Sequence, residues 1–246
     1  ESVVLMVDGV RINSGQPQGS LASQLDLGLL ERAEVVKGPG SVLYGSGAMG
    51  GVVNLITPQA RFTEQDERGG RFSTSASSVD KGFAGATLLR DSSSDHALVL
   101  GVAGRKVNDY KSPNGTEENT GYSSDTLLLK YKQRLAEDIS VNLNVQRHTD
   151  RDVWYPGSAR TGGPPGAAGI PVPLGTATLH SPEPQRALLQ IGPQTRLGAG
   201  TLSPQLYPQD VYRQIRAYSE RPHPPDLPHN PTFLTYGLRP TRAVPV

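Results

Sequence analysis

Polar and apolar residues alternate along the middle of the chain, from about residue 69 to residue 150. The clearest run is 139–146, Ile-Ser-Val-Asn-Leu-Asn-Val-Gln, where aliphatic residues hold the odd positions and hydrogen-bonding residues the even ones. Residues 127–132 follow the same pattern less regularly, and 82–91 and 96–107 fit strands with small residues interleaved. Successive side chains of a strand point to opposite faces. The pattern therefore predicts strands with one apolar and one polar face.

The connectors between these strands alternate in length. We predict three tight turns and three long polar or Gly/Pro-rich loops, taken in turn along the chain: 92–95, 108–121, 135–138, 151–182, 197–200 and 220–231. Alternating short turns and long loops are typical of outer-membrane barrels, whose long loops face outward. A soluble β-sandwich also has amphipathic strands of about ten residues. The alternation by itself leaves both architectures open.

The two ends of the chain differ from this middle part. Residues 151–246 hold 17 of the 21 prolines, and Pro193, Pro204 and Pro208 interrupt runs that otherwise resemble strands. Because proline cannot donate to a strand ladder, these positions fit bulges or a ragged edge. In residues 1–68 we predict a strand with an Asp8-Gly9 turn, a short helix with Asp26 as its N-cap, and two further strands: 2–10, 26–31, 33–37 and 51–57.

Composition excludes several classes of protein. Lys plus Arg number 24 against 23 Asp plus Glu, a balance that argues against a general nucleic-acid binder. The absence of cysteine excludes disulfides and thiolate chemistry within this sequence. No apolar run of about 18 residues predicts a transmembrane helix. The sequence begins inside a strand-like run without a signal peptide, and we expect a fragment of a longer protein.

Candidate catalytic motifs fail for lack of context. Residues 45–50 match G-x-G-x-x-G, but a β-branched run ended by Pro58 follows, where dinucleotide binding requires a helix. We interpret the motif as a tight turn. The histidines have no metal-ligand spacing, so we expect no enzyme activity, no cofactor and no metal site. We interpret the charged residues of the first part as ion pairs rather than a catalytic cluster: Asp8, Glu31, Arg32, Glu34 and Lys37.

Residues 29–57, with the sequence LLERAEVVKGPGSVLYGSGAMGGVVNLIT, resemble the second half of the plug domain of TonB-dependent outer-membrane receptors. The Val-Asp-Gly-Val of residues 7–10 also resembles that plug. The resemblance implies a partial α+β plug in 1–68 and, in 69–246, about eight antiparallel strands of a transmembrane barrel of about 22 strands, an all-β-dominated fold. The residues matching the turn of the plug motif are Gly38, Pro39, Tyr44, Gly45, Gly47, Gly50 and Gly51.

The resemblance also implies a function. Receptors of this family lie in the cell outer membrane and import scarce ligands with energy relayed by TonB. We expect uptake of an iron complex, with a ferric siderophore first, through a TonB box that this sequence lacks. Haem, haemoprotein or cobalamin uptake and a non-transporting binding fragment or adhesin remain alternatives. For haem, connector parity places these possible iron ligands toward the outside: His148, His180, His223 and His229.

Site residues follow from the same resemblance. The loop at the outward tip of the plug contacts ligand in this family, which implies roles for Arg11, Asn13, Gln16 and Gln18, with 26–28 near a second such loop. A charged strand fixes the plug to the barrel wall, which implies contact residues Glu31, Arg32, Glu34 and Lys37. We also expect a polar inner barrel face that holds the plug by hydrogen bonds and ion pairs. Outer-membrane lipid is an expected partner, and nucleic acid is not.

Overall fold

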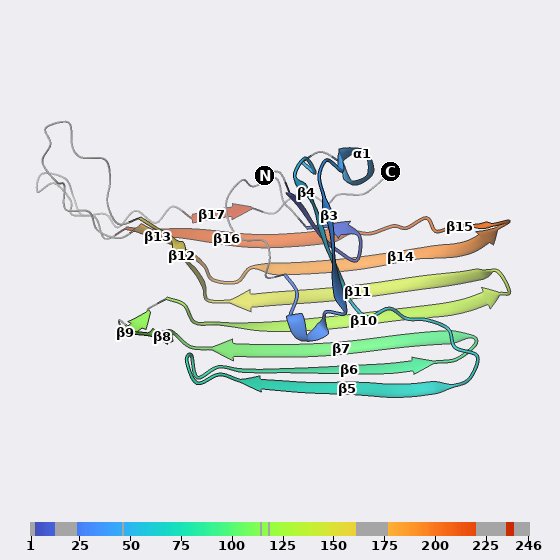
Figure 1. Ribbon diagram of the computed structural model, residues 1–246, viewed down its shortest axis with the longest axis horizontal. Helices are drawn as coiled ribbons and strands as arrows, with labels where there is room; N and C mark the ends of the chain where they lie inside the picture. The colour runs from blue at the N-terminus through green and yellow to red at the C-terminus, as the bar shows by residue number, and fades with distance from the viewer. Residues whose placement is uncertain are drawn as a thin grey trace, which may run out of the picture.

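The computed structural model describes residues 3–12, 24–45, 47–113, 115–117, 119–160, 177–219 and 235–238. These residues form a four-stranded sheet, an eleven-stranded sheet and a two-stranded hairpin. We refer to the first two as the small sheet and the large sheet. The strands of the small sheet run across those of the large sheet (Figure 1).

The small sheet has the strand order β2-β1-β4-β3. It comprises β1 (Val3–Val7), β2 (Val10–Arg11), β3 (Arg32–Lys37) and β4 (Gly51–Ile56). Strand β1 pairs in parallel with β4, and the remaining pairs are antiparallel. Asp8 and Gly9 form the turn between β1 and β2 at φ angles of 49° and 79°. The three strand predictions for this part of the chain are confirmed.

Two short helices accompany the small sheet. The helix predicted at 26–31 is a single 3-10 turn, η1 (Leu27–Leu29), and Asp26 caps it by accepting from the Gly28 N–H at 2.7 Å. Helix α1 (Ser41–Tyr44) precedes the glycine turn and was not predicted. No helix follows that turn, because β4 begins at Gly51. A Cβ on Gly51 would lie 2.4 Å from the Val36 carbonyl oxygen, so the pairing of β3 with β4 requires glycine there.

The large sheet is antiparallel and has the order β12-β13-β16-β14-β11-β10-β7-β6-β5, with β15 on β14 and β17 on β16. The tight turns lie at one end of the strands and the long connectors at the other end, as predicted (Figure 1). Counting β11/β12, β13/β14 and β15/β16 each as one interrupted strand gives eight strands in the described ranges, in agreement with the expected number. The bounds are β5 (Glu67–Ala76), β6 (Phe83–Ser92), β7 (His96–Val107), β10 (Tyr122–Ala136), β11 (Ile139–Arg151), β12 (Val153–Arg160), β13 (Ala177–Ser181), β14 (Gln185–Leu197), β15 (Gly200–Leu202), β16 (Gln209–Ser219) and β17 (Thr235–Leu238), and the separate hairpin is β8 (Tyr110–Ser112) with β9 (Gly115–Glu117).

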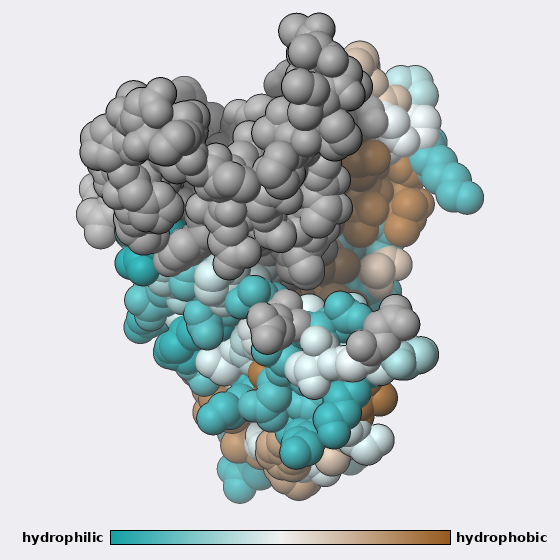
Figure 2. Space-filling model, turned by 90° about the vertical axis from the view of Figure 1, so that its left-hand side faces the viewer, coloured by the Kyte–Doolittle hydropathy of each residue, from teal (hydrophilic) through white to brown (hydrophobic). Residues whose placement is uncertain are grey.

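Alternation along the strands sorts their side chains as the sequence predicts. In β11 the even positions Ser140, Asn144 and Gln146 are buried, and the odd positions between them are partly exposed. Large apolar side chains are exposed on the opposite face of the neighbouring strands. They are Leu89, Val102, Leu127, Leu189 and Ile191. The end that carries the long connectors is mainly hydrophilic in the lower part of Figure 2.

The expectation of a polar inner face is wrong for the middle of β6 and β7. The inward positions in the middle of these strands are aliphatic, and Leu29 of η1 inserts among them in a buried cluster. A Cβ on Gly28 would lie 2.7 Å from the Ala86 Cβ, so η1 approaches β6 as closely as glycine allows. The cluster, which joins η1 to the large sheet, contains Leu29, Ala86, Leu88, Val99, Ala103 and Leu128.

The proline-rich part keeps its strands by placing proline where donors are not required. Pro193 lies inside β14 opposite Val141 of β11, and on its other side the β16 and β15 pairings stop short of it. Pro204 and Pro208 lie outside the strands. Across the described ranges, no helix is long and apolar enough to cross a membrane.

Candidate functional site

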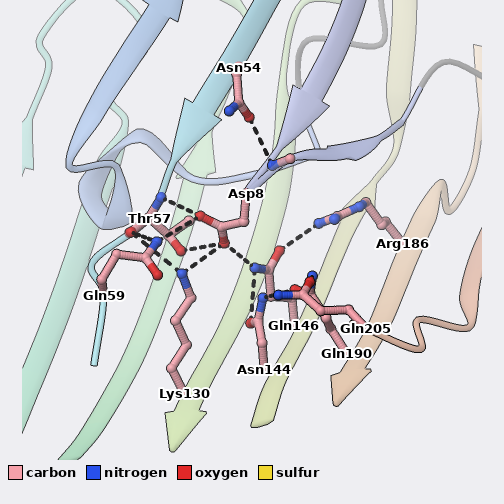
Figure 3. A network of polar contacts seen from close by, with 11 residues as sticks. Asp8, Asn54, Thr57, Gln59, Lys130, Asn144, Gln146, Arg186, Gln190 and Gln205 are labelled. Carbon is pink, nitrogen blue, oxygen red and sulfur yellow. Dashed lines mark hydrogen bonds and ion pairs between the residues drawn. The ribbon is translucent and has the colours of Figure 1, made fainter. Parts of the chain in front are cut away.

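Asp8 lies where the small sheet meets the large sheet (Figure 3). Its turn conformation directs the carboxylate to the residues just after β4. Oδ1 accepts from the Thr57 N–H at 3.0 Å and from Gln59 Nε2 at 3.2 Å, and Oδ2 accepts from Thr57 Oγ1 at 2.7 Å. The adjacent Gly9 N–H donates to Asn54 Oδ1 at 3.1 Å. These bonds set the direction in which the carboxylate points.

The large sheet supplies two further donors to the same carboxylate. Lys130 Nζ lies 2.9 Å from Asp8 Oδ2, and both side chains are about one-twentieth exposed, at 6% and 5%. Gln146 Nε2 donates to the same oxygen at 2.5 Å. Lys130 belongs to β10 and Gln146 to β11, so one carboxylate joins the turn to two strands. A buried charge is tolerated only when paired and hydrogen-bonded, and Asp8 meets both conditions.

A chain of amide contacts continues from Gln146 toward β14 and β16. Arg186 Nη1 donates to Gln146 Oε1 at 2.8 Å, and Arg186 Nε donates to Gln209 Oε1 at 3.1 Å. Gln209 Nε2 in turn donates to the Arg11 carbonyl at 2.9 Å, which returns the chain to the small sheet. Arg186 is 1% exposed, and its Nη2 has no hydrogen-bond partner among the described residues. The guanidinium is thus buried between neutral amide groups.

A second set of contacts joins η1 and its cap to the large sheet. Asp26 accepts from Arg105 Nε of β7 at 3.3 Å while it caps the helix. Arg71 of β5 donates through Nη2 to the Gly28 carbonyl at 3.0 Å. Together with Leu29 in its aliphatic cluster, these contacts fix η1 to β5, β6 and β7, which the Asp8 network does not reach, and to β10.

A cavity of about 510 Å³ lies between the two sheets next to Asp8. Amide side chains dominate its lining, with Lys130 and Lys132 of β10 and Arg32 of β3 as the basic groups. Lys132 Nζ donates to Gln194 Oε1 at 2.8 Å and lies 5.0 Å from the centre of the Phe62 ring. Such a lining suits a ligand rich in oxygen acceptors.

Two of the four histidines considered as iron ligands, His148 and His180, are held by contacts within the large sheet. His148 is buried, with Nδ1 2.8 Å from Thr126 Oγ1 and Nε2 3.0 Å from Asp150 Oδ1. His180 stacks on Trp154 with ring centroids 4.2 Å apart. His223 and His229 lie outside the described residues. Within the described ranges, no three His, Asp or Glu side chains are grouped as metal ligands.

The long connector between β7 and β10 is organised by one carboxylate. Asp109 Oδ1 accepts from the backbone N–H groups of Gly121 and Thr120, both at 2.8 Å. These hydrogen bonds, with that from Gly121 first, lower the pKa of Asp109 below its usual 3.8. The ionised carboxylate therefore holds the two ends of the connector together.

The structure locates only part of the predicted site. Arg11 lies in β2, and Asn13, Gln16 and Gln18 lie outside the described residues. Every residue of β3 is exposed, and Arg32 pairs at 2.7 Å with Glu34 of its own strand. The predicted plug–wall roles of Glu31, Arg32, Glu34 and Lys37 remain predictions.

Sequence reasoning missed the residues that the large sheet contributes to the Asp8 network. Lys130, Gln146 and Arg186 are long polar residues at inward positions of alternating strands, which is the signal that could have identified them. The interpretation of Asp8 as part of a structural ion pair agrees with its contact to Lys130. The glycine turn lies beside a core formed by Val4, Met6, Ala48 and Val52, against which Tyr44 packs.

Comparison with known proteins adds a family match. Residues 1–52 match the model of the TonB-dependent Receptor Plug Domain. The chain is 36% identical over 155 residues to a vitamin B12 transporter, BtuB, of Vibrio vulnificus strain CMCP6, which covers 62% of the chain and 23% of that protein. It is 29% identical over 167 residues to a hemin receptor of Yersinia pestis, which covers 67% of the chain and 24% of that protein. The chain thus spans about a quarter of the length of these relatives.

Solved structures share the fold at lower identity. The copper transporter OprC superposes with a TM-score of 0.65 at 12% identity, over 87% of this chain and 31% of that one. The ferric citrate transporter FecA superposes with a TM-score of 0.60 at 22% identity, over 90% of this chain and 32% of that one. Both sheets are thus found together in solved proteins of known fold.

Proposed function

The chain belongs to the TonB-dependent receptor family, and from this premise we propose that it is a segment of an outer-membrane receptor that imports a ferric siderophore. Residues 1–68 are the later part of the plug and residues 69–246 the first strands of the barrel. TonB supplies the energy through a segment outside this sequence. The apolar outward face of the large sheet contacts lipid, as the exposed Val102, Leu127 and Leu189 indicate.

The observation that carries this proposal is how the small sheet contacts the large sheet, which is the barrel wall in this proposal. The contact is made by polar groups whose hydrogen bonds can be exchanged for others. Asp8 bonds to Lys130 and Gln146 of the wall and to Thr57 and Gln59 of its own segment. A plug must leave or rearrange without losing its own fold. Hydrogen bonds that water or ligand can replace favour such a movement more than an apolar core does.

Charge supports an anionic ligand. Arg186 is buried with neutral hydrogen-bond partners, and Lys132 bonds to a neutral amide. Iron(III) complexes of catecholate or hydroxycarboxylate siderophores carry negative charge and many oxygen acceptors, and they would compensate these cations. In the proposal, Arg11, Asn13, Gln16 and Gln18 contact the ligand at the outward tip of the plug. In the same proposal, the plug contacts the barrel wall through Glu31, Arg32, Glu34 and Lys37.

Cobalamin is the second candidate. The observation that favours it is the 36% identity to a protein named as a vitamin B12 transporter. Cobalamin presents neutral amides and one phosphodiester, so it would compensate less of the positive charge near Arg186 and Lys132. Haem is less favoured, because the imidazole of His148 is buried and both of its nitrogens are engaged.

Binding and transport are tested separately. The protein, purified from outer membranes in detergent, is titrated with iron(III)–enterobactin, cyanocobalamin and haemin, and quenching of its tryptophan fluorescence gives each Kd. Cells are then assayed for uptake of radioactive iron with and without TonB. We expect the tightest binding for the ferric catecholate and uptake only with TonB. Tighter binding of cyanocobalamin would replace the siderophore by cobalamin, and binding without TonB-dependent uptake would leave a non-transporting receptor.

A further inference from the structure

The cavity between the sheets has the size of a small-molecule site. Its volume of about 510 Å³ falls inside the range of roughly 300–1,000 Å³ typical of ligand pockets. The small sheet and the segment after it contribute Asp8, Asn54 and Gln59, and the wall contributes the larger share. The amide side chains of the lining are Asn54, Gln59, Asn142, Asn144, Gln190, Gln194 and Gln205.

The charges of this lining do not balance. Asp8 is its one carboxylate among the described residues, and that carboxylate is committed to Lys130 at 2.9 Å. Lys132 has the neutral Gln194 as hydrogen-bond partner and the Phe62 ring beneath it. Arg32 is the third basic residue of the lining, and Glu34 compensates its charge at the surface, so Lys132 is the cation without a carboxylate partner. The cavity therefore combines excess positive charge with many amide donors, the combination that recognises oxygen-rich anions.

The cavity lies on the far side of Asp8 from the long connectors. Strand β10 runs from the end of the large sheet with the long connectors, at Tyr122, to the end with the tight turns, at Ala136. Lys130 and Lys132 lie in its second half, nearer the tight turns than Thr126, which pairs with His148 of β11. A ligand that enters between the long connectors and moves along the wall therefore meets the Asp8 contacts first and the cavity next.

We propose that this cavity is a transit site for a small oxygen-rich anion, in which the ligand replaces Asp8 as the counter-ion of Lys130. The proposal rests on the proposed transport function and adds a second, inner site to it. When the Asp8 turn leaves the large sheet, Lys130 loses the carboxylate that balances its charge. A ligand carboxylate or catecholate restores that balance by taking the vacated position beside Gln146.

Linkage makes this exchange reciprocal. An anion that binds only when Asp8 has moved shifts the population toward the displaced turn, and displacement of the turn raises the affinity for the anion by the same factor. The amides of Asn144 and Gln190, which bond to each other at 2.9 Å, would supply donors to the remaining ligand oxygens. While the ligand occupies the site, return of the Asp8 turn is thus disfavoured.

Thiol labelling tests the site directly. The chain has no cysteine, so Gln190→Cys places a single reporter in the cavity and Thr116→Cys places a matched reporter on the exposed β8–β9 hairpin. Each variant, purified in detergent, is reacted with an anionic and a cationic methanethiosulfonate of similar size. We expect a ratio of anionic to cationic rates at position 190 at least about fivefold above that at position 116. Citrate should slow labelling at position 190 and leave position 116 unchanged.

Two background substitutions assign the effect to the cavity. Lys132→Gln should lower the rate ratio at position 190 by about threefold or more, and Asp8→Asn should raise it, because each changes one charge of the lining. Equal ratios at positions 190 and 116, or a ratio unaffected by Lys132→Gln, would overturn the transit site. Lys132→Gln suffices if Asp8→Asn does not fold.

The outcome is independent of the proposed function. Labelling needs neither TonB nor uptake. If position 190 shows no preference for the anionic reagent while TonB-dependent iron uptake is intact, only the transit site is disproved. Loss of uptake with the anion preference intact removes the proposed transport and leaves an anion-binding cavity.

Discussion

The carboxylate of Asp8 and the ammonium of Lys130, 2.9 Å apart and both nearly inaccessible to solvent, join the turn of the small sheet to the wall of the large sheet. Asp8→Ala should lower the free energy of unfolding by about 3–5 kcal/mol, because it leaves a buried ammonium without a counter-ion. Asp8→Ala combined with Lys130→Met should recover much of that loss. Guanidinium denaturation of the purified protein measures both.

The exposed pair of Arg32 and Glu34 provides the control for this cycle. Its side chains are about half exposed, at 49% and 48%, so Arg32→Gln should cost no more than about 1 kcal/mol. If Asp8→Ala proved as mild as Arg32→Gln, Lys130 would not depend on Asp8, and the ion pair would have no part in holding the two sheets together.

Gly28 is expected to tolerate no side chain. A Cβ there would lie 2.7 Å from the Ala86 Cβ, so Gly28→Ala forces η1 away from β6. We expect a loss of about 1–3 kcal/mol in the free energy of unfolding. Gly69→Ala is the matched control, because nothing lies within 4 Å of its added Cβ. Equal midpoints of denaturation for the two variants would show that η1 is not packed against the wall.

The two faces of β11 should respond differently to a charge. Val141 and Leu143 occupy odd positions on the apolar side, while Asn142 lines the cavity. Val141→Arg or Leu143→Arg should impair assembly in the outer membrane by about 2–4 kcal/mol more than Asn142→Arg, if the residue lies near the middle of the bilayer. Folded and unfolded fractions on unheated gels measure this. Equal effects would contradict the assignment of the faces.

Acid should release the connector between β7 and β10. The pKa of Asp109 is lowered by the N–H groups of Gly121 and Thr120, so its contribution is complete above the unfolded value of 3.8. That contribution is lost as the pH falls through the lower folded pKa. The amide resonances of Thr120 and Gly121 should therefore shift together only once the pH falls below 3.8. Asp109→Asn should abolish this transition, and its persistence in that variant would assign it to another group.

Local sequence determined the strands, the faces of the strands and the order of the connectors. In 139–146 every second residue is aliphatic, and strand geometry alone converts that period into an apolar and a polar face. The Asp8-Gly9 turn and the Asp26 cap depend on neighbours a few residues away, so they too could be predicted. The resemblance to plug domains supplied the family, because a nearly gap-free motif of this length is specific.

Only the tertiary structure decided which residues meet between the sheets. Gln146 lies 138 positions from Asp8 in sequence, and no periodicity relates them. The aliphatic inner face of β6 and β7 was likewise not expected, because small residues such as Ala86 are compatible with either face until Leu29 packs on them. Side-chain period is a property of one strand, whereas the partner of a buried carboxylate depends on how two sheets cross. Sequence therefore determined the surfaces, and the crossing of the sheets determined the site.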